Sequence, residues 1–265
     1  MNSFFSLPIK SIKRLTKDSV QLSFDTENSS DFNFIPGQYI TVKSVINGIE
    51  ERRAYSICST LDEGLAIGVK LVEGGKMSTF LTKDISVGDS LDIMPPSGNF
   101  TLSTKNNHIV CICAGSGITP ILSMIKSELN SSTTSKVTLI YSNRNSSSVM
   151  FKIVLEELEK NYPNRLKIHW FYSQEKVQSS FFGRIDKDSL QNLLNTFSEI
   201  KQANDFFICG PGQIIDNTNE LLLLNNINQK KINFERFTTV EKTDVTDNVS
   251  NEIVSNVLVS VDGED

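Results

Sequence analysis

The apolar pattern of this 265-residue chain changes once along its length, between residues 102 and 107. The preceding part contains short runs with alternating or β-branched residues, such as Val20–Phe24 and Tyr39–Val42. Pairs that favour turns, including Pro36-Gly37 and Asn47-Gly48, separate these runs. Many short strands at this spacing predict a small antiparallel barrel or sandwich.

The pattern that follows alternates between strands and helices. His108–Ala114 is a continuous apolar strand, and Pro120–Leu129 has the period of an amphipathic helix. Such alternation predicts a parallel sheet whose ligands lie beyond the carboxyl ends of the strands. Further strands are expected at Lys136–Tyr141, Leu166–Tyr172, Phe206–Cys209 and Ile232–Phe234, and further helices at Met150–Lys160, Ser189–Phe197 and Ile214–Leu224.

These patterns divide the chain into three parts. We expect a barrel over residues 1–104, an α/β domain over residues 105–238 and a tail over residues 239–265. The tail begins with a polar stretch, Thr239–Asn256, which has the composition of a linker. It ends in Val257–Gly263, which reads as a strand and turn without a partner.

Composition excludes several classes of protein. The formal net charge is −5, so the chain lacks the basic balance of a nucleic-acid binder. No apolar run approaches the roughly 20 residues of a membrane span, and Met1–Lys10 does not resemble a signal peptide. We therefore expect a cytoplasmic protein. The cysteines lie mostly in apolar runs and are most simply buried hydrophobes, with no metal site among them.

Two glycine-rich turns follow predicted strands of the α/β domain. In Gly115-Ser-Gly117-Ile-Thr119-Pro120, glycines allow close approach to a pyrophosphate, and Thr119 can cap the helix that follows. Cys209-Gly-Pro-Gly212 repeats the arrangement, with Cys209 expected at the mouth of the sheet. Each could be an ordinary tight turn, and Cys209 a plain buried thiol, but two such turns on neighbouring strands favour a dinucleotide cleft.

The barrel region carries its own candidate site. Arg53 and Tyr55 are two residues apart on one strand, so they share a face that could hold a phosphate and a planar ring. Separately, they could be a solvated charge and a core aromatic. The segment Gly74–Thr79 can begin a short helix whose free amides meet a pyrophosphate, although a simple hairpin turn is the alternative.

In order and spacing, these motifs resemble those of the ferredoxin–NADP reductase superfamily over about residues 8–237. The resemblance implies an all-β, six-stranded antiparallel flavin-binding barrel followed by an α/β, five-stranded parallel nucleotide-binding domain. The matching segments are Phe34-x-Pro-Gly-Gln-Tyr39, Arg53-x-Tyr-Ser56, Gly74-Gly-x-x-Ser78, Pro96-Ser-Gly-x-Phe100, Gly115-x-Gly-x-Thr-Pro120 and Cys209-Gly-Pro211.

The resemblance also implies residue roles in moving a hydride from nicotinamide C4 to N5 of FAD. Arg53 would pair with the flavin pyrophosphate, Tyr55 would pack on the flavin ring, and Ser56 would hydrogen-bond near N5. Cys209 would lie near nicotinamide C4. In relatives an acid stands close to the flavin where this chain has Glu235, although an exposed strand-end carboxylate is the alternative. Backbone amides of Gly75, Lys76, Met77 and Ser78, with the Ser78 hydroxyl, would hold the pyrophosphate, and Gly115 and Thr119 would line the nicotinamide dinucleotide.

The second strand of the α/β domain bears on the choice of nicotinamide. NADH-selective sites usually place an acid at its end, whereas this chain reads Tyr141-Ser-Asn-Arg-Asn145. Arg144 and Arg184 could together bind a 2′-phosphate, or each could be a solvated surface arginine. The sequence therefore favours NADPH and leaves NADH possible.

The electron acceptor is expected to be an iron–sulfur centre. One branch of the family carries a [2Fe–2S] domain after the reductase core and serves multicomponent oxygenases, including the phenylacetyl-CoA epoxidase system. The ligand pattern Cys-x₄-Cys-x₂-Cys is absent here. The cluster is thus expected in a missing domain or a separate partner, and we favour truncation.

Three alternatives remain open on the sequence alone. The chain could be a stand-alone NADPH–ferredoxin or flavodoxin reductase, although its long tail counts against this. It could be a flavin-binding electron-transfer subunit without its own NAD(P)H turnover. It could also be a cofactor-free interaction domain, against which the intact set of Arg53, Tyr55, Ser56 and Ser78 argues.

Overall fold

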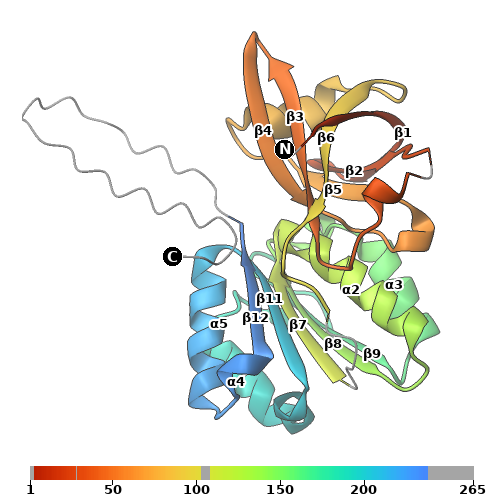
Figure 1. Cartoon of the computed structure of the whole chain (residues 1–265). Coiled ribbons are helices and arrows are strands. Elements are labelled where there is room, and N and C mark those ends of the chain that lie inside the picture. The colour runs from red at the N-terminus through yellow and green to blue at the C-terminus, as the bar shows by residue number, and fades with distance from the viewer. Residues whose placement is uncertain (1–2, 28, 103–107, 238–265) are drawn as a thin grey trace, which may run out of the picture.

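A computed structural model describes residues 3–27, 29–102 and 108–237. Figure 1 shows two domains stacked end to end, a strand-rich domain above a layered sheet with helices on both sides. The predicted domain boundaries, at residues 104–105 and 238–239, and the tail segments Thr239–Asn256 and Val257–Gly263 lie outside the described residues. Among those residues, no helix is both long and apolar enough to cross a membrane.

The first domain, called the barrel domain below, is a six-stranded antiparallel sheet with strand order β4-β3-β6-β1-β2-β5. A bridge between Ile57 and Ile67 joins the end of β4 to β5, so the sheet curls towards closure. Short helices complete the domain. Its elements are β1 (Phe5–Thr16), β2 (Ser19–Phe24), η1 (Ser30–Phe32), β3 (Tyr39–Ile46), β4 (Ile49–Ser56), η2 (Leu61–Glu63), β5 (Ala66–Lys70), α1 (Lys76–Thr79), η3 (Phe80–Asp84) and β6 (Ser90–Ser97).

The barrel core follows the period of two that the sequence shows. Val20, Leu22 and Phe24 alternate along β2 and are buried, while Ile40 and Val42 do the same on β3. Side chains on one face of each strand therefore fill a single apolar interior. The opposite face is left to present polar and charged groups, including those of β4.

The second domain, called the α/β domain, is a parallel sheet with strand order β10-β9-β8-β7-β11-β12. Chain order reverses between β7 and β11, which makes the gap above these two strands the topological switch point. Its elements are β7 (His108–Ala114), η4 (Gly115–Gly117), α2 (Ile118–Ser131), β8 (Lys136–Asn143), η5 (Ser146–Ser148), α3 (Lys152–Asn161), β9 (Leu166–Tyr172), β10 (Phe181–Phe182), α4 (Lys187–Thr196), η6 (Ser198–Gln202), β11 (Asp205–Gly210), α5 (Gly212–Leu224), η7 (Gln229–Lys231) and β12 (Ile232–Arg236).

Strand β7 shows why its sequence is apolar throughout. Cys111 and Cys113 pack in the cluster with α2 and α3, whereas Val110 and Ile112 pack in the cluster with α4 and α5. A strand covered by helices on both faces needs apolar residues at every position. The free cysteines of the described chain are all buried.

The two domains meet through specific contacts between the barrel and α2. Ser123 Oγ donates a hydrogen bond of 2.6 Å to the Ser59 carbonyl, and Lys126 forms a 2.7 Å ion pair with Glu63. A β-carbon on Gly68 of β5 would lie 2.6 Å from Cγ2 of Thr119. The absence of a side chain at Gly68 therefore allows the barrel to press against the start of α2.

The structure confirms the predicted fold and differs in two details. The sheet of the α/β domain has a sixth strand, β10, which spans only Phe181–Phe182 and leaves no periodic signal in the sequence. Helix α2 begins at Ile118, directly after the turn η4, so Thr119 is not the N-cap. Its hydroxyl instead donates to the Ser116 carbonyl at 3.0 Å, within the turn.

Candidate flavin and dinucleotide sites

The end of β4 presents three of the predicted residues. Arg53 is exposed, Tyr55 is half-buried against the barrel core, and Ser56 is 4% exposed. Burial raises the pKa of the Tyr55 hydroxyl well above its ordinary value. Tyr55 is therefore a neutral ring at physiological pH, with one side on the core and a planar surface at the edge of the barrel.

A carboxylate joins two of the predicted phosphate ligands. Oε1 of Glu51, on β4, accepts a 2.9 Å hydrogen bond from Lys76 Nζ. The other carboxylate oxygen, Oε2, lies 3.0 Å from Nη2 of Arg53. Its side chain is 11% exposed, and the hydrogen bond from Lys76, together with the charge of Arg53, lowers its pKa. The carboxylate of Glu51 thus links β4 to the short helix α1 by pairing with Arg53 on the strand and Lys76 on the helix.

The turn before α1 is organised by the Ser78 hydroxyl. Ser78 Oγ donates to the Gly75 carbonyl at 3.2 Å and accepts from the Val72 amide at 3.1 Å. Gly75 is the N-cap residue and has no capping side chain. The hydroxyl of Ser78 therefore fixes the turn, and the amides at the start of α1, from Lys76 and Met77, are the groups best placed to meet an anion.

Ser56, Cys209 and Glu235 come together where the two domains meet. Ser56 Oγ donates a 3.1 Å hydrogen bond to Oε2 of Glu235, across 179 positions of the sequence. Glu235 is paired in the sheet with Cys209, its neighbour on β11. Burial raises the pKa of Glu235 to about 7, while burial and then the charge of Glu235 raise that of the Cys209 thiol.

A cleft of about 1100 Å³ opens at the switch point, between the carboxyl ends of the parallel strands and the barrel. A β-carbon on Gly117 would lie 2.3 Å from the carbonyl oxygen of Cys209, so η4 can approach β11 only with glycine at this position. The cleft is lined by Ala114, Gly115 and Ser116 of the first turn, and by Gly210, Pro211 and Gly212 of the second. The two turns read from the sequence thus share one cleft.

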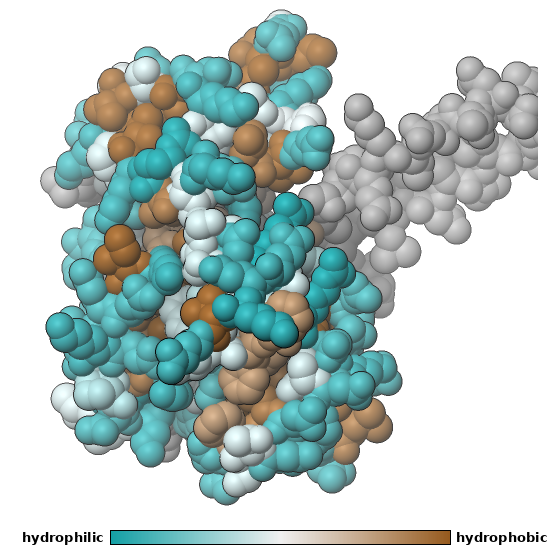
Figure 2. Space-filling view, turned by 180° about the vertical axis from the view of Figure 1, so that it is seen from behind, coloured by the Kyte–Doolittle hydropathy of each residue, from teal (hydrophilic) through white to brown (hydrophobic). Residues whose placement is uncertain are grey.

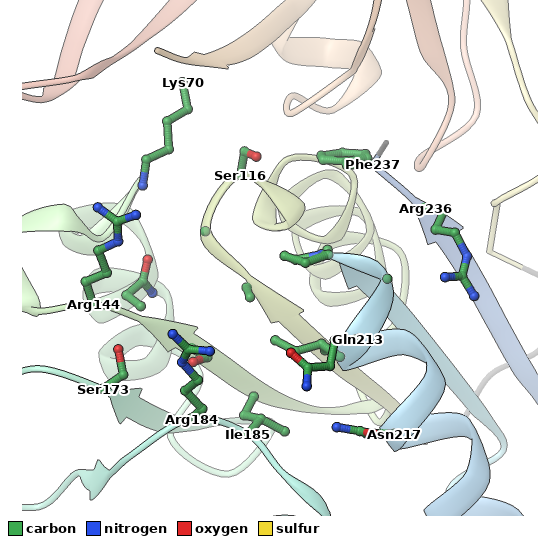
Figure 3. Close-up of a pocket in the computed structure, with 18 of the residues that line it drawn as sticks. Lys70, Ser116, Arg144, Ser173, Arg184, Ile185, Gln213, Asn217, Arg236 and Phe237 are labelled. Carbon is green, nitrogen blue, oxygen red and sulfur yellow. The ribbon is translucent and has the colours of Figure 1, made fainter. Parts of the chain in front are cut away.

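One wall of the cleft gathers cations from both domains. Figure 3 shows Lys70 reaching down from the barrel towards Arg144, with Arg184 below them. Among the described residues, none of these three side chains has an ion-pair or hydrogen-bond partner. Unpaired cations along a concave wall favour an anionic ligand.

The opposite wall consists of polar residues from α5 and β12. Figure 3 places Gln213, Asn217 and Arg236 there, with Phe237 near Ser116 at the upper end. Arg236 pairs with Asp216 of α5. Viewed from behind, mostly hydrophilic residues cover the molecule, with apolar side chains in small groups (Figure 2). This wall of the cleft therefore offers polar side chains to a ligand.

Sequence reasoning and structure differ on which residues reach the cleft. Gly115, Arg144 and Arg184 line it, whereas Thr119 and Cys209 are fully buried beneath it and do not. Lys70 and Phe237 line it although no motif pointed to them. Lys70 ends a barrel strand, so its position over the other domain follows from tertiary packing that no local pattern encodes.

Comparison with known proteins finds two oxidoreductase domain models that match successive parts of the chain. An oxidoreductase FAD-binding domain model matches residues 6–102, and an oxidoreductase NAD-binding domain model matches residues 111–220. A subunit of the 1,2-phenylacetyl-CoA epoxidase from Escherichia coli is 36% identical over 246 residues, covering 90% of this chain and 69% of the relative. The ferredoxin reductase component of 3-ketosteroid-9-alpha-monooxygenase from Mycobacterium tuberculosis is 30% identical, covering 97% and 73%.

A solved structure shares the fold. A ferredoxin NADP⁺ reductase from Neisseria gonorrhoeae with bound FAD and NADP superposes with a TM-score of 0.75 at 21% identity, covering 89% of this chain and 99% of that one. Barrel, switch-point cleft and sequence matches together define an oxidoreductase that binds FAD and a nicotinamide dinucleotide. The chain belongs to the family of FAD- and NAD-binding oxidoreductases that includes the phenylacetyl-CoA epoxidase subunit and the ketosteroid monooxygenase reductase component described above, and it has the fold of ferredoxin NADP⁺ reductase.

Proposed function

We propose that this enzyme takes a hydride from NADPH onto FAD and passes electrons singly to an iron–sulfur acceptor, as the reductase component of a multicomponent oxygenase. The observation that carries the proposal is the Ser56–Glu235 hydrogen bond, which joins the predicted flavin strand to the strand beside the dinucleotide cleft. It puts a hydroxyl and a carboxyl that can exchange a proton at the junction of the two sites.

The residues around β4 and α1 fit a flavin with its pyrophosphate. Arg53, Lys76 and the first amides of α1 face one another across a gap that one carboxylate spans, and Tyr55 offers a ring at the barrel edge. In the proposal, Arg53 and the amides of Lys76, Met77 and Ser78 hold the pyrophosphate while Tyr55 packs on the ring. The Gly75 amide was also expected to contribute, but it already donates to the Val72 carbonyl at 3.0 Å. When bound, the flavin supplies the chemistry of accepting two electrons together and releasing them one at a time.

The reacting groups would be positioned by three residues at the domain junction, Ser56, Glu235 and Cys209. With its pKa raised to about 7, Glu235 is present in both protonation states near neutral pH, so it can hold or release a proton through Ser56. The Cys209 thiol stays protonated because burial raises its pKa. We assign it a packing role beneath the nicotinamide rather than that of a nucleophile.

The preference for NADPH rests on the cationic wall of the cleft. Arg144 follows the end of β8, where no acid stands, and Arg184 and Lys70 lie on the same side of the cleft (Figure 3). Three unpaired cations suit a ligand with a pyrophosphate and an additional 2′-phosphate. Gly115 and the η4 turn would contact the pyrophosphate, and Thr119 would support that turn from below.

The acceptor is proposed from the relatives. The phenylacetyl-CoA epoxidase protein is named as one subunit of its enzyme, and the ketosteroid monooxygenase protein as the ferredoxin reductase component of its own. A similar chain would deliver electrons to an oxygenase through a [2Fe–2S] centre, in an attached domain or a separate ferredoxin. The terminal substrate lies outside the proposal.

Anaerobic addition of NADPH to the flavin-loaded protein tests the proposal. We expect bleaching of the flavin band near about 450 nm within seconds, and slower bleaching by NADH. Absence of bleaching by either nucleotide would refute reductase function, while faster reduction by NADH would refute the preference for NADPH.

Replacement of Ser56 tests the role of the junction. Ser56→Ala should slow flavin reduction in stopped flow by about 10-fold or more, because it removes the hydroxyl that bonds Glu235. Ser11→Ala, at an exposed position of β1, is the control and should behave like the wild type. A wild-type rate in Ser56→Ala would exclude the proposed role of Ser56.

A further inference from the structure

Four oxidisable side chains form a row across the α/β sheet, and the row starts at the junction of the two domains. Cys209 of β11 is the register partner of Cys113 of β7. Cys113 in turn pairs in register with Tyr141 of β8, and Tyr141 with Trp170 of β9. All four pack in or against the apolar cluster on the side of α2 and α3. Since neighbouring strands lie about 4.8 Å apart, the row is roughly 14 Å long.

Interactions connect the members of the row, and one end reaches the surface. Burial and then the neighbouring Cys209 raise the pKa of the Cys113 thiol, while burial and then Cys113 raise the pKa of the Tyr141 hydroxyl. The ring centroids of Tyr141 and Trp170 are 5.9 Å apart, and Tyr172 stacks on Trp170 with the ring planes 7° apart. Trp170 is half-buried, whereas the other three members are fully buried. The row therefore leads from the junction to the surface.

Neighbouring rows of the same sheet have a different composition. The row one residue earlier, on the opposite face, consists of Ile208, Ile112, Ile140 and His169. The row two residues earlier, on the same face, consists of Phe207, Cys111, Leu139 and Ile168. Aliphatic residues and phenylalanine fill a core equally well and resist loss of an electron. Among the described rows, only the one that starts at Cys209 has an oxidisable side chain on each of four successive strands.

The thiols of this row are suited to one kind of oxidation. Cys209 and Cys113 hold their protons because burial raises their pKa, so reaction of a thiolate with peroxide is suppressed. A one-electron oxidant can still take a hydrogen atom from a protonated thiol. Superoxide, which oxygen forms when it takes one electron from a reduced flavin, is such an oxidant. With a proton from water, it would convert the Cys209 thiol to a thiyl radical and itself become hydrogen peroxide.

We propose that the row carries this oxidising equivalent from Cys209 to Trp170 and so protects the reaction site from damage. One electron passes along the row to the Cys209 radical, and Glu235, the register partner of Cys209 on β12, supplies the proton that restores the thiol. Tyr141 gives one electron and receives one from Trp170, so it ends unchanged. Trp170 loses one electron to the row and its indole N–H proton to water. A soluble thiol can reduce the radical left there, and without one, oxygen adds to the ring. The proposal rests on the proposed function, which supplies the superoxide.

Peptide mass spectrometry after aerobic turnover tests the proposal, because oxygen adducts record where the radical settles. The flavin-loaded protein is supplied with NADPH and air, without an acceptor or a thiol. In the wild type we expect adducts on Trp170 and an intact Cys209. Tyr141→Phe keeps Trp170 but interrupts the row, so adducts on Trp170 should fall and sulfinic and sulfonic acid at Cys209 should rise, each by at least about fivefold per bound flavin. Trp170→Phe removes the end of the row and should raise oxidation of Cys209 by a similar factor.

Tyr162→Phe is the matched control, since Tyr162 is half-buried against the same cluster but lies outside the row, and it should give the wild-type pattern. Adducts on Trp170 that persist in Tyr141→Phe would mean that solvent oxidises Trp170 directly. An intact Cys209 in Trp170→Phe would mean that the row protects nothing, and either result overturns the proposal. If NADPH fails to reduce the flavin, the proposed function is wrong. Cycles of dithionite reduction and air then supply superoxide for the same comparison of variants, which still decides on the row.

Discussion

The two anion sites of this molecule treat their cations in opposite ways. In the barrel, Arg53 and Lys76 share the carboxylate of Glu51, whereas in the cleft Lys70 and Arg144 have no ion-pair partner among the described residues. The barrel site is thus partly neutralised from within, whereas the wall of the cleft that carries Lys70 and Arg144 keeps its positive charge for a ligand. This contrast suits a cofactor that stays bound and a substrate that must be attracted, bound and released.

Another acid, Glu235, stands at the boundary between the two sites, and its replacement gives the largest expected effect. Its pKa is about 7 in the folded chain against an ordinary value of 4.5, so the folded protein binds this proton more tightly. The contribution to stability is complete below pH 4.5 and is lost as pH rises through 7. Above that range, ionisation of this half-buried carboxylate costs up to about 3 kcal/mol.

Glu235→Gln should therefore stabilise the flavin-free chain at pH 8 by up to about 3 kcal/mol and change little at pH 4. Urea unfolding at the two pH values measures this. Glu157→Gln, on the exposed face of α3, removes the same charge and should have no such pH dependence. Equal stability of wild type and Glu235→Gln at pH 8 would mean that Glu235 is ionised without penalty.

The second-largest effect is expected for NADPH binding when the cations of the cleft are removed. Replacing both Arg144 and Arg184 with alanine should raise the KM for NADPH by about 100-fold, on the order of 3 kcal/mol for two charge-assisted contacts, with KM for NADH within a few-fold. Raising the salt concentration should weaken NADPH binding to wild type more than to the double variant. Parallel losses for both nucleotides would show that these arginines hold a group common to the two.

The sequence predicted those features of the two sites that depend on residues close together in the chain. The glycine turns after β7 and β11 and the Arg53-x-Tyr55 strand were recognised because each function requires particular residues at fixed spacing. Strand β10, with two residues, was missed because it spans a single period of alternation, which is too short to form a pattern. The parallel direction of the strands in the α/β domain followed from the alternation of strands and helices, whereas their order in the sheet was not predicted.

Contacts between distant segments could not be predicted in the same way. The Ser56–Glu235 bond joins residues 179 positions apart, and Lys70 of the barrel lines a cleft that is formed mostly by the α/β domain. The carboxylate of Glu51, between Arg53 and Lys76, likewise depends on how α1 is folded against β4. Each requires knowledge of domain packing, which has no local sequence signal.

On the barrel side, Arg53→Ala should weaken FAD binding by about 30-fold, on the order of 2 kcal/mol for one hydrogen-bonded charge. Fluorescence titration of the flavin-free protein measures the change. Arg52→Ala on the same strand is the matched control, because Arg52 pairs with Glu50 instead. If both variants bind FAD equally well, the pyrophosphate does not lie against Arg53.

The variant with the smallest expected effect tests directly whether the barrel and the cleft differ in how their cations are paired. If the flavin pyrophosphate competes with Glu51 for Arg53 and Lys76, Glu51→Gln should bind FAD more tightly, by about twofold to fivefold at low salt. The gain should shrink at high salt, because these groups are partly exposed and screened. Glu50→Gln, one position earlier on β4, should leave FAD affinity unchanged. Weaker FAD binding by Glu51→Gln would instead show that Glu51 holds Arg53 and Lys76 in place for the pyrophosphate. The barrel would then differ from the cleft because its cations are positioned by an acid, not because an acid competes with the ligand for them.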